Sequence, residues 1–560
     1  MRVRITIFIF ITIVIIQSDC VQDQAPVQAV QKGNTVLYEN EIIDHDQEWA
    51  ADTTRIIKSN LFIQHATLRI KPGAAVQLRA NASITVMQSG GIIAEGTTTK
   101  HVRFVKETKG QSGWNHIYLS SNVNGDSCRF VNCTFDGGGA DPDWPAAIFC
   151  QDVSPTILNC TISNSQSAGI SLQGDCSAVQ FKGNTITGCA DVPIMTDLIN
   201  AARIDSGSYT NNDVNEIRIL NGEIHRDIAL PLHNMAYHFT DYVDLFGATL
   251  SILPGTLLKF DELTGLVAHA NSTLNLKATS DSPIQLTGHE TTQNRWQGLQ
   301  FEAGSTGEID YCTIDNAAYN TDIPASIVIN NASPTLTNSQ IKDGYGYGIY
   351  LSGIYRPARF DNNIITRNTQ APVSANAANV SQLALNDYKG NIDDLIEIRG
   401  GAIDGLINQY TEWPKLNVPV YRIQGSIYID QGTLVLSPGI RLEMSAQSSI
   451  EIKTGGELIA NGSSGIITFT GIKKTAGYWG SIKFAETSSP TGNLLNMCII
   501  ENGGGANLLP GMIYCDRSSP TITNCQIGHS LTYGIYKTNG AAPYLLNNIF
   551  DDNLMGNLYP

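Results

Sequence analysis

The sequence predicts an all-β solenoid of about 20 stacked coils, built from three repeats of about 180 residues. Three observations carry this prediction. One unit recurs three times along the 560 residues, its strands are short and alternate between apolar and polar residues, and turn residues separate the strands. Only 15% of the residues are charged, which argues against long solvated helices, because those need Glu, Lys and Arg on their outer faces.

The repeat is clearest in three blocks that align without a gap, 133–162, 312–341 and 498–527. Each block opens with a cysteine and carries Ser-Pro-Thr in its last third. A tryptophan stands upstream of each block before a short apolar strand, at Trp114, Trp296 and Trp479. The predicted solenoid therefore spans 46–560 and divides at about 46–224, 225–404 and 405–560.

Within a unit the strands are three to five residues long, as at Thr67–Ile70, Ala75–Leu78 and Ser83–Val86. Pro72-Gly73 and Asn81 separate them, and such residues are typical of turns. Three short strands in about 25 residues cannot bury their own apolar face, so we expect successive coils to stack and share one core.

Asparagine and cysteine recur at the coil corners. We expect the asparagines to adopt left-handed or bridge geometry and to hydrogen-bond the next coil. These residues are Asn159, Asn184, Asn338, Asn363, Asn524 and Asn548. Cys133 lies one coil from Cys160, and Cys498 one coil from Cys525. We expect buried thiols in an interior stack, with disulfides as the alternative that export permits.

Several motifs of the third unit resemble the right-handed parallel β-helix repeat proteins, which are pectin-lyase-like solenoids common on bacterial surfaces. The motifs are Leu-Ser-Pro-Gly at 436–439, Gly-Glu-Leu-Ile-Ala-Asn-Gly at 456–462, Tyr-Trp-Gly-Ser-Ile-Lys-Phe at 478–484 and Ser-Ser-Pro-Thr-Ile-Thr-Asn-Cys at 518–525. The resemblance covers about 46–560 and implies the fold. It implies no single activity, because the fold hosts polysaccharide lyases, glycoside hydrolases and adhesins.

The N-terminus predicts export. Arg2 and Arg4 precede the apolar run 5–16, which is too short to span a bilayer core of about 30 Å, so residues 1–19 are predicted to be a signal peptide. Cys20 resembles the lipidated cysteine of bacterial lipoproteins, which predicts a lipid anchor at the outer membrane or cell surface. Ordinary cleavage and secretion is the alternative. Residues 20–45 are predicted to be a polar tether or an N-terminal cap.

Charge excludes one class of partner. The formal net charge is −16, and no basic footprint for nucleic acid is visible. We expect a monomer whose partner is a polysaccharide or an extracellular matrix glycan.

One loop of the first unit, 137–145, combines glycines with Asp141, Asp143 and Trp144. Such a loop could bind Ca²⁺ or a sugar. The sequence favours a structural role for this loop, because the matching third-unit loop, 503–510, carries no acid. No histidine spacing typical of metal ligands is present, so we expect no other metal or cofactor.

Aromatic residues near the turns could form a stripe on which sugar rings stack, although core packing is the role that the sequence favours for them. The tyrosines proposed for stacking are Tyr319, Tyr345, Tyr347 and Tyr533, joined by Tyr350, Tyr536, Trp144 and Trp413.

Catalysis is the rival hypothesis. A lyase of this fold needs a base and a carboxylate neutraliser, and a hydrolase needs two carboxylates across a groove. The candidate groove for such an enzyme surrounds Arg203, Arg218, Arg356 and Arg359. Catalysis usually needs one unique pocket, whereas the three units are near-equal copies with no singular residue cluster. The sequence therefore favours a non-catalytic surface protein for glycan binding or adhesion over a polysaccharide lyase or glycoside hydrolase.

Overall fold

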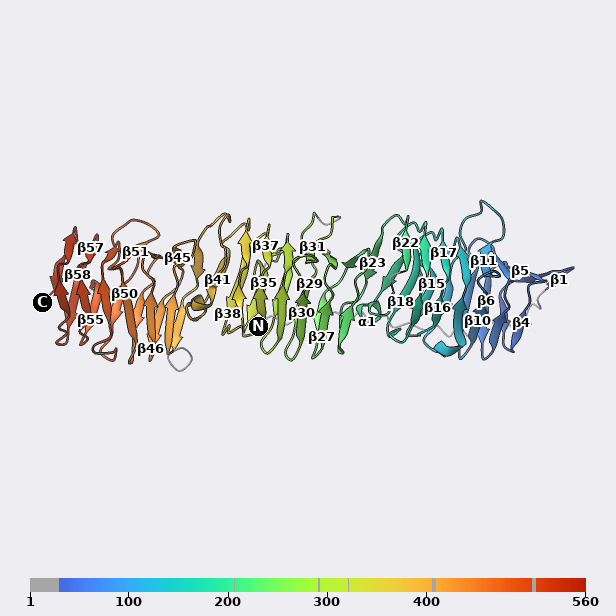
Figure 1. Cartoon of the computed structure of the whole chain (residues 1–560), viewed down its shortest axis with the longest axis horizontal. Helices are drawn as coiled ribbons and strands as arrows, with labels where there is room; N and C mark the ends of the chain where they lie inside the picture. The colour runs from blue at the N-terminus through green and yellow to red at the C-terminus, as the bar shows by residue number, and fades with distance from the viewer. Residues whose placement is uncertain are drawn as a thin grey trace, which may run out of the picture.

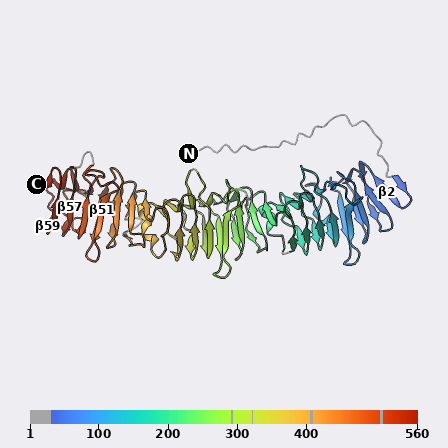
Figure 2. The ribbon, with the colours of Figure 1, turned by 90° about the horizontal axis from the view of Figure 1, so that it is seen from above.

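The structure is a computed structural model that describes residues 30–205, 207–290, 293–320, 322–404, 409–505 and 510–559. The chain forms one parallel β-solenoid of about 21 turns, which confirms the predicted fold class and coil number. Figures 1 and 2 both show a long rod that runs from β1 (Val30–Lys32) to β61 (Gly556–Tyr559). Among the described helices, none has the length and apolar character needed to cross a bilayer.

Each coil contributes one strand to each of three faces. The coil of β8 (Ala75–Leu78), β9 (Ser83–Met87) and β10 (Gly91–Glu95) is typical, and each of these strands pairs in parallel with strands one coil away. Apolar side chains point inward from all faces, as Val76 and Leu78 do, and are fully buried. Stacking therefore joins the coils around one continuous hydrophobic core.

The three repeated tryptophans are structural. Trp114, Trp296 and Trp479 are fully buried. Each indole Nε1 donates a 2.8 Å hydrogen bond to a backbone carbonyl of the following block, and the acceptors are Asp136, Asp315 and Glu501. The three repeats therefore share the same local geometry at this position.

Successive repeats are turned about the rod axis by one face. The strand after the Pro-Gly turn is β8 in the first repeat, β28 (Leu257–Phe260) in the second and β48 (Arg441–Met444) in the third. These three strands belong to the 9-stranded, 14-stranded and 13-stranded sheets. Short helical segments, α1 (Leu198–Ala201) and η3 (Ala377–Leu383), lie at the two junctions. Equivalent outward-facing side chains of the three repeats therefore point in different directions.

The sheets begin before residue 46, where the sequence predicted the start of the solenoid. β2 (Thr35–Tyr38) and β3 (Glu41–Ile43) already pair with the next coil. β1 pairs with β2 in antiparallel fashion at the end of its sheet. The predicted signal peptide, 1–19, and Cys20 lie outside the described residues, as does the 20–29 part of the tether or cap predicted over 20–45.

The corner asparagines fall into two groups, which corrects the single ladder expected from the sequence. Asn159, Asn338 and Asn524 have left-handed φ values of 52°, 51° and 53°. Asn184 belongs to the other group. Because Thr161 pairs with Thr185, Asn184 lies beside Cys160 and not beside Asn159. Its side chain, 1% exposed, accepts from the Cys160 N–H at 2.9 Å and donates to the Ile157 carbonyl. Asn363 and Asn548 make the same interior bonds.

The cysteine stack confirms the favoured interpretation. All ten described cysteines are free and buried. The Cys133 thiol donates to the Ala94 carbonyl and the Cys160 thiol to the Phe130 carbonyl, and Cys498 and Cys525 do the same in the third repeat.

Candidate functional site

A cavity of about 490 Å³ opens on the second repeat. Tyr319, on the loop after β34 (Cys312–Asp315), and Tyr345, in the turn before β38 (Tyr347–Ser352), meet there at 5.8 Å between ring centroids. Backbone bonds fix both residues, from Tyr319 N–H to Trp296 O and from Tyr345 N–H to Ala317 O. The other lining residues are Glu262, Leu263, Gln297, Ala318, Asn320 and Pro324.

A cation lies beside these rings. The Arg295 guanidinium carbon is 4.6 Å from the Tyr319 ring centroid and 5.8 Å from that of Tyr345. The side chain of Tyr345 is 40% exposed, so its ring remains accessible. Aromatic faces, side-chain amides and one carboxylate are groups that bind the C–H faces and hydroxyls of sugars. A guanidinium group such as that of Arg295 can pair with an acidic substituent.

Among the described residues, the pair formed by Tyr319 and Tyr345 occurs in the second repeat alone. Tyr345 N–H, Gln166 N–H and Leu531 N–H each bond the carbonyl at the equivalent corner, so these residues correspond. Ala140 takes the place of Tyr319 in the first repeat. Neither of the other two repeats therefore has a tyrosine equivalent to Tyr345, and the first repeat has none equivalent to Tyr319.

The other tyrosines proposed for stacking lie apart from the cavity. The ring centroids of Tyr347 and Tyr350 lie 6.4 Å apart, and the Tyr347 hydroxyl donates to Glu397 Oε1. Tyr533 lies in β58 (Tyr533–Thr538) of a different sheet, within a tyrosine group at the rod's C-terminal end. The aromatic residues therefore form separate groups and no continuous stripe.

Two further aromatic predictions have definite outcomes. Trp413 is fully buried and donates to the Ala377 carbonyl, so the proposed sugar contact for it is wrong. Trp144 is 37% exposed and packs beside His116 and Tyr118.

The loop of Asp141 and Asp143 is internally bonded. Asp141 Oδ1 accepts from the Asp143 N–H at 3.0 Å, and its Oδ2 lies 3.5 Å from Nδ1 of His116. Burial lowers the pKa of His116, which favours its neutral form despite Asp141. The Ca²⁺ role of this loop stays a prediction.

The four arginines proposed for a catalytic groove belong to different elements, and each has its own partner. Arg218 in β23 (Glu216–Ile219) forms a bidentate pair with Asp191 at 2.5 and 2.7 Å. Arg203 donates to Ser177 O, Arg356 to Tyr355 O, and Arg359 to Asp361. Their guanidinium groups are thus engaged in local bonds.

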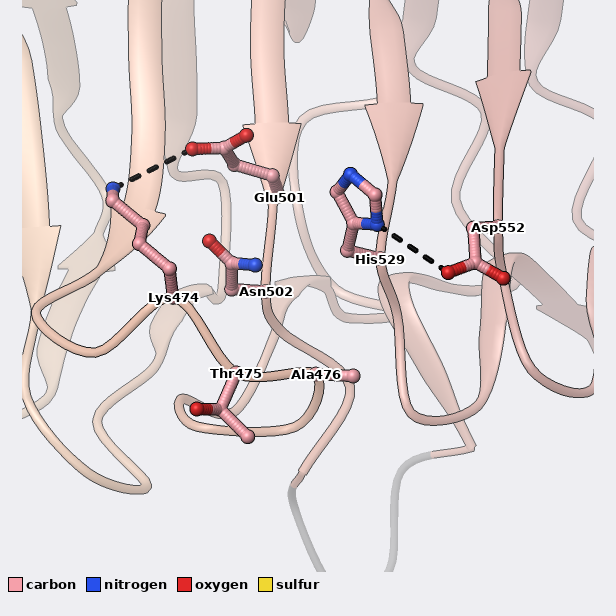
Figure 3. A pocket seen from close by; sticks show the side chains of 7 residues that line it. All are labelled: Lys474, Thr475, Ala476, Glu501, Asn502, His529 and Asp552. Carbon is pink, nitrogen blue, oxygen red and sulfur yellow. Dashed lines mark hydrogen bonds and ion pairs between the residues drawn. The ribbon is translucent and has the colours of Figure 1, made fainter.

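A second cavity, of about 530 Å³, lies on the third repeat and is polar. Figure 3 shows its lining, with Lys474 facing Glu501 and His529 facing Asp552. The Lys474 Nζ to Glu501 Oε1 distance is 3.5 Å, and His529 Nδ1 lies 3.6 Å from Asp552 Oδ2. These groups have the chemistry of general acids and bases.

One buried group, formed by Glu216, His238 and His289, was not predicted from the sequence, and we call it the junction cluster. One ligand atom from each of these residues lies within 4.8 Å of the others. Burial alone would raise the pKa of Glu216, but contacts with His238 and Lys259 outweigh it and lower this pKa to about 2. Burial would likewise lower the pKa of His238, but Asp261 and Glu216 raise it.

The comparisons with known proteins agree with the fold. Residues 115–226 and 261–388 match the family model described as the right handed beta helix region. No curated protein and no solved structure matched the chain at the significance required.

Proposed function

We propose that this chain, a right-handed parallel β-helix, is an exported, non-catalytic surface protein that binds a polysaccharide or a matrix glycan. The cavity between Tyr319 and Tyr345 is the observation that supports this function most directly. It offers an exposed aromatic face with polar groups at its rim, and its volume lies within the range of about 300–1,000 Å³ typical of ligand pockets.

The ligand's chemistry follows from the lining. Tyr345 stacks on the apolar face of a pyranose ring, while Gln297 and Asn320 hydrogen-bond its hydroxyls. Arg295 favours glycans that carry a carboxylate or sulfate, which offsets repulsion from the acidic protein surface.

A glycan array tests this function. The purified protein is applied with Ca²⁺ and with chelator, and the same wells are sampled for released oligosaccharide. We expect binding to acidic glycans without product. Loss of binding in chelator would direct attention to the Asp141 and Asp143 loop, and release of product would overturn the non-catalytic proposal.

Anchoring through Cys20 is part of the proposal. A lipid on this cysteine would hold the rod at the outer membrane or cell surface. Metabolic labelling with palmitate should mark the wild-type protein and leave the Cys20→Ala variant unlabelled. Persistent label in the variant would show that Cys20 is not the anchor.

A polysaccharide lyase or glycoside hydrolase is the second candidate function. The polar cavity of Figure 3 favours it, because Lys474 and Glu501 meet His529 and Asp552 there. If the array wells contain product, Lys474→Ala should abolish its release while binding at the Tyr345 cavity persists.

A further inference from the structure

We propose that the junction cluster is a binding site for a divalent transition metal of the Zn²⁺ type. Glu216 starts β23, His238 lies in β25 (Ala236–Phe239), and His289 follows β31 (Ile284–Gly288). All three strands belong to the 14-stranded sheet, at the junction of the first and second repeats. The inward neighbours Ile217 and Tyr237 fill the core, so Glu216 and His238 point to the outer face.

The donor atoms have the spacing of a metal site. Glu216 Oε2 lies 3.0 Å from His289 Nε2 and 3.3 Å from His238 Nδ1. Two ligands of tetrahedral Zn²⁺, each bound at about 2.1 Å, lie about 3.4 Å apart. One carboxylate and two imidazoles form a donor set that suits this metal and leaves a fourth position open.

An unpaired nitrogen independently indicates a ligand. His238 is 5% exposed, and its Nδ1 is buried and makes no hydrogen bond, although Glu216 Oε2 is close by. Its other nitrogen, Nε2, contacts Asp261 Oδ1 at 2.9 Å. This is the arrangement in which a carboxylate orients a metal-binding imidazole and directs the lone pair of the opposite nitrogen toward the metal.

The surrounding charges favour a cation. Lys259 Nζ holds Glu216 Oε1 at 2.8 Å and Glu290 Oε1 at 2.7 Å, which leaves Glu216 Oε2 toward the imidazoles. With Asp261, three carboxylates face one ammonium. A divalent ion would offset this excess of negative charge, of which the Glu216 carboxylate is the buried part.

Binding has a structural consequence. The rings of His238 and His289 are stacked, with their centroids 3.7 Å apart and their planes inclined by 8°. Because an imidazole lone pair lies in the plane of its ring, the two planes must open for both nitrogens to reach one ion. The metal would then join three strands across the junction of the repeats.

Titration calorimetry of the chelator-treated protein with Zn²⁺ tests the site. We expect one ion per chain, and a loss of affinity of about tenfold or more in Glu216→Gln and in His289→Ala. Asp261→Asn should weaken binding about 10–100-fold, because it removes the group that orients His238. His269→Ala is the matched control, since His269 forms an equivalent pair with Asp244 at 2.8 Å outside the cluster.

Two results would overturn the proposal. One is the absence of stoichiometric binding by the wild-type protein, and the other is equal affinity in the wild type and Glu216→Gln. Circular dichroism of each variant in chelator separates misfolding from loss of a ligand. Glu216→Gln keeps the side-chain shape, so it tests the site even if His289→Ala unfolds. Co²⁺ provides a second readout, because its visible spectrum changes with the ligands it binds.

Discussion

Replacing Asn363 by leucine should break the bonds that connect two coils. The Asn363 side chain is 1% exposed. Its Oδ1 accepts from the Ser339 N–H at 3.0 Å, and its Nδ2 donates to the Leu336 carbonyl at 2.8 Å. Leucine has a similar size and can form neither bond, so two backbone groups lose their partners.

The magnitude follows from these two groups. Each unsatisfied buried group costs about 1–3 kcal/mol, and burying the more apolar leucine returns about 1–2 kcal/mol. We expect a net destabilisation of about 2–3 kcal/mol, the middle of the resulting range. The same change at Asn275, an outward-facing residue of β30 (Thr273–Lys277), is the control and should cost less than about 0.5 kcal/mol.

Hydrogen exchange is the appropriate assay, because a long solenoid need not unfold in a single step. The Ser339 amide donates to Asn363, so its protection should fall about 30-fold or more in Asn363→Leu. Unchanged protection of the Ser339 amide would show that its hydrogen bond to Asn363 does not stabilise the folded state. Urea unfolding of both variants gives the global effect for comparison.

Three other predictions concern thiols, pH and the tryptophans. With the ten described cysteines buried, Ellman's reagent should modify none of them in the native protein and all ten in denaturant; fewer in denaturant would reveal disulfides. Burial raises the pKa of Asp197 to about 6, so the contribution of this carboxyl group to stability is greatest below pH 4 and is lost as pH rises from 4 through 6. This loss is about 1–2 kcal/mol after solvent screening, and melting curves of Asp197→Asn should lack it. Trp296→Phe removes the bond to the Asp315 carbonyl and should lower stability by about 1–3 kcal/mol in urea, whereas an unchanged midpoint would contradict a structural role.

The sequence was sufficient to predict the stacked coils, because their strands and turns are local patterns repeated three times. It misplaced Asn184 by one residue. The spacing from Asn159 suggested one column, whereas the register places Asn184 beside Cys160, where its amide bonds the backbone of the coil before. Only the pairing of strands distinguishes these two positions.

The site was harder to predict, because it depends on how coils are turned and offset. The rotation of one face per repeat places Tyr347 and Tyr533 in different sheets, although their sequence contexts match. Glu216 and His238 are 22 positions apart, close to one coil, and His289 lies two strands further along the same sheet. A search for polar residues at multiples of the coil length could have found the junction cluster, whereas spacing rules for compact metal motifs could not.

The claim that the cavity of Tyr319 and Tyr345 binds a glycan is tested by the affinity of the Tyr345→Ala variant for an acidic oligosaccharide selected on the array. Tyr410→Ala is the matched control, since Tyr410 is 63% exposed and lies in β44 (Tyr410–Trp413) of another sheet. If the cavity binds the glycan, calorimetry will show a loss of about tenfold or more, about 1.4 kcal/mol, in Tyr345→Ala and no change in Tyr410→Ala. Equal affinity of the wild type and Tyr345→Ala would contradict the account.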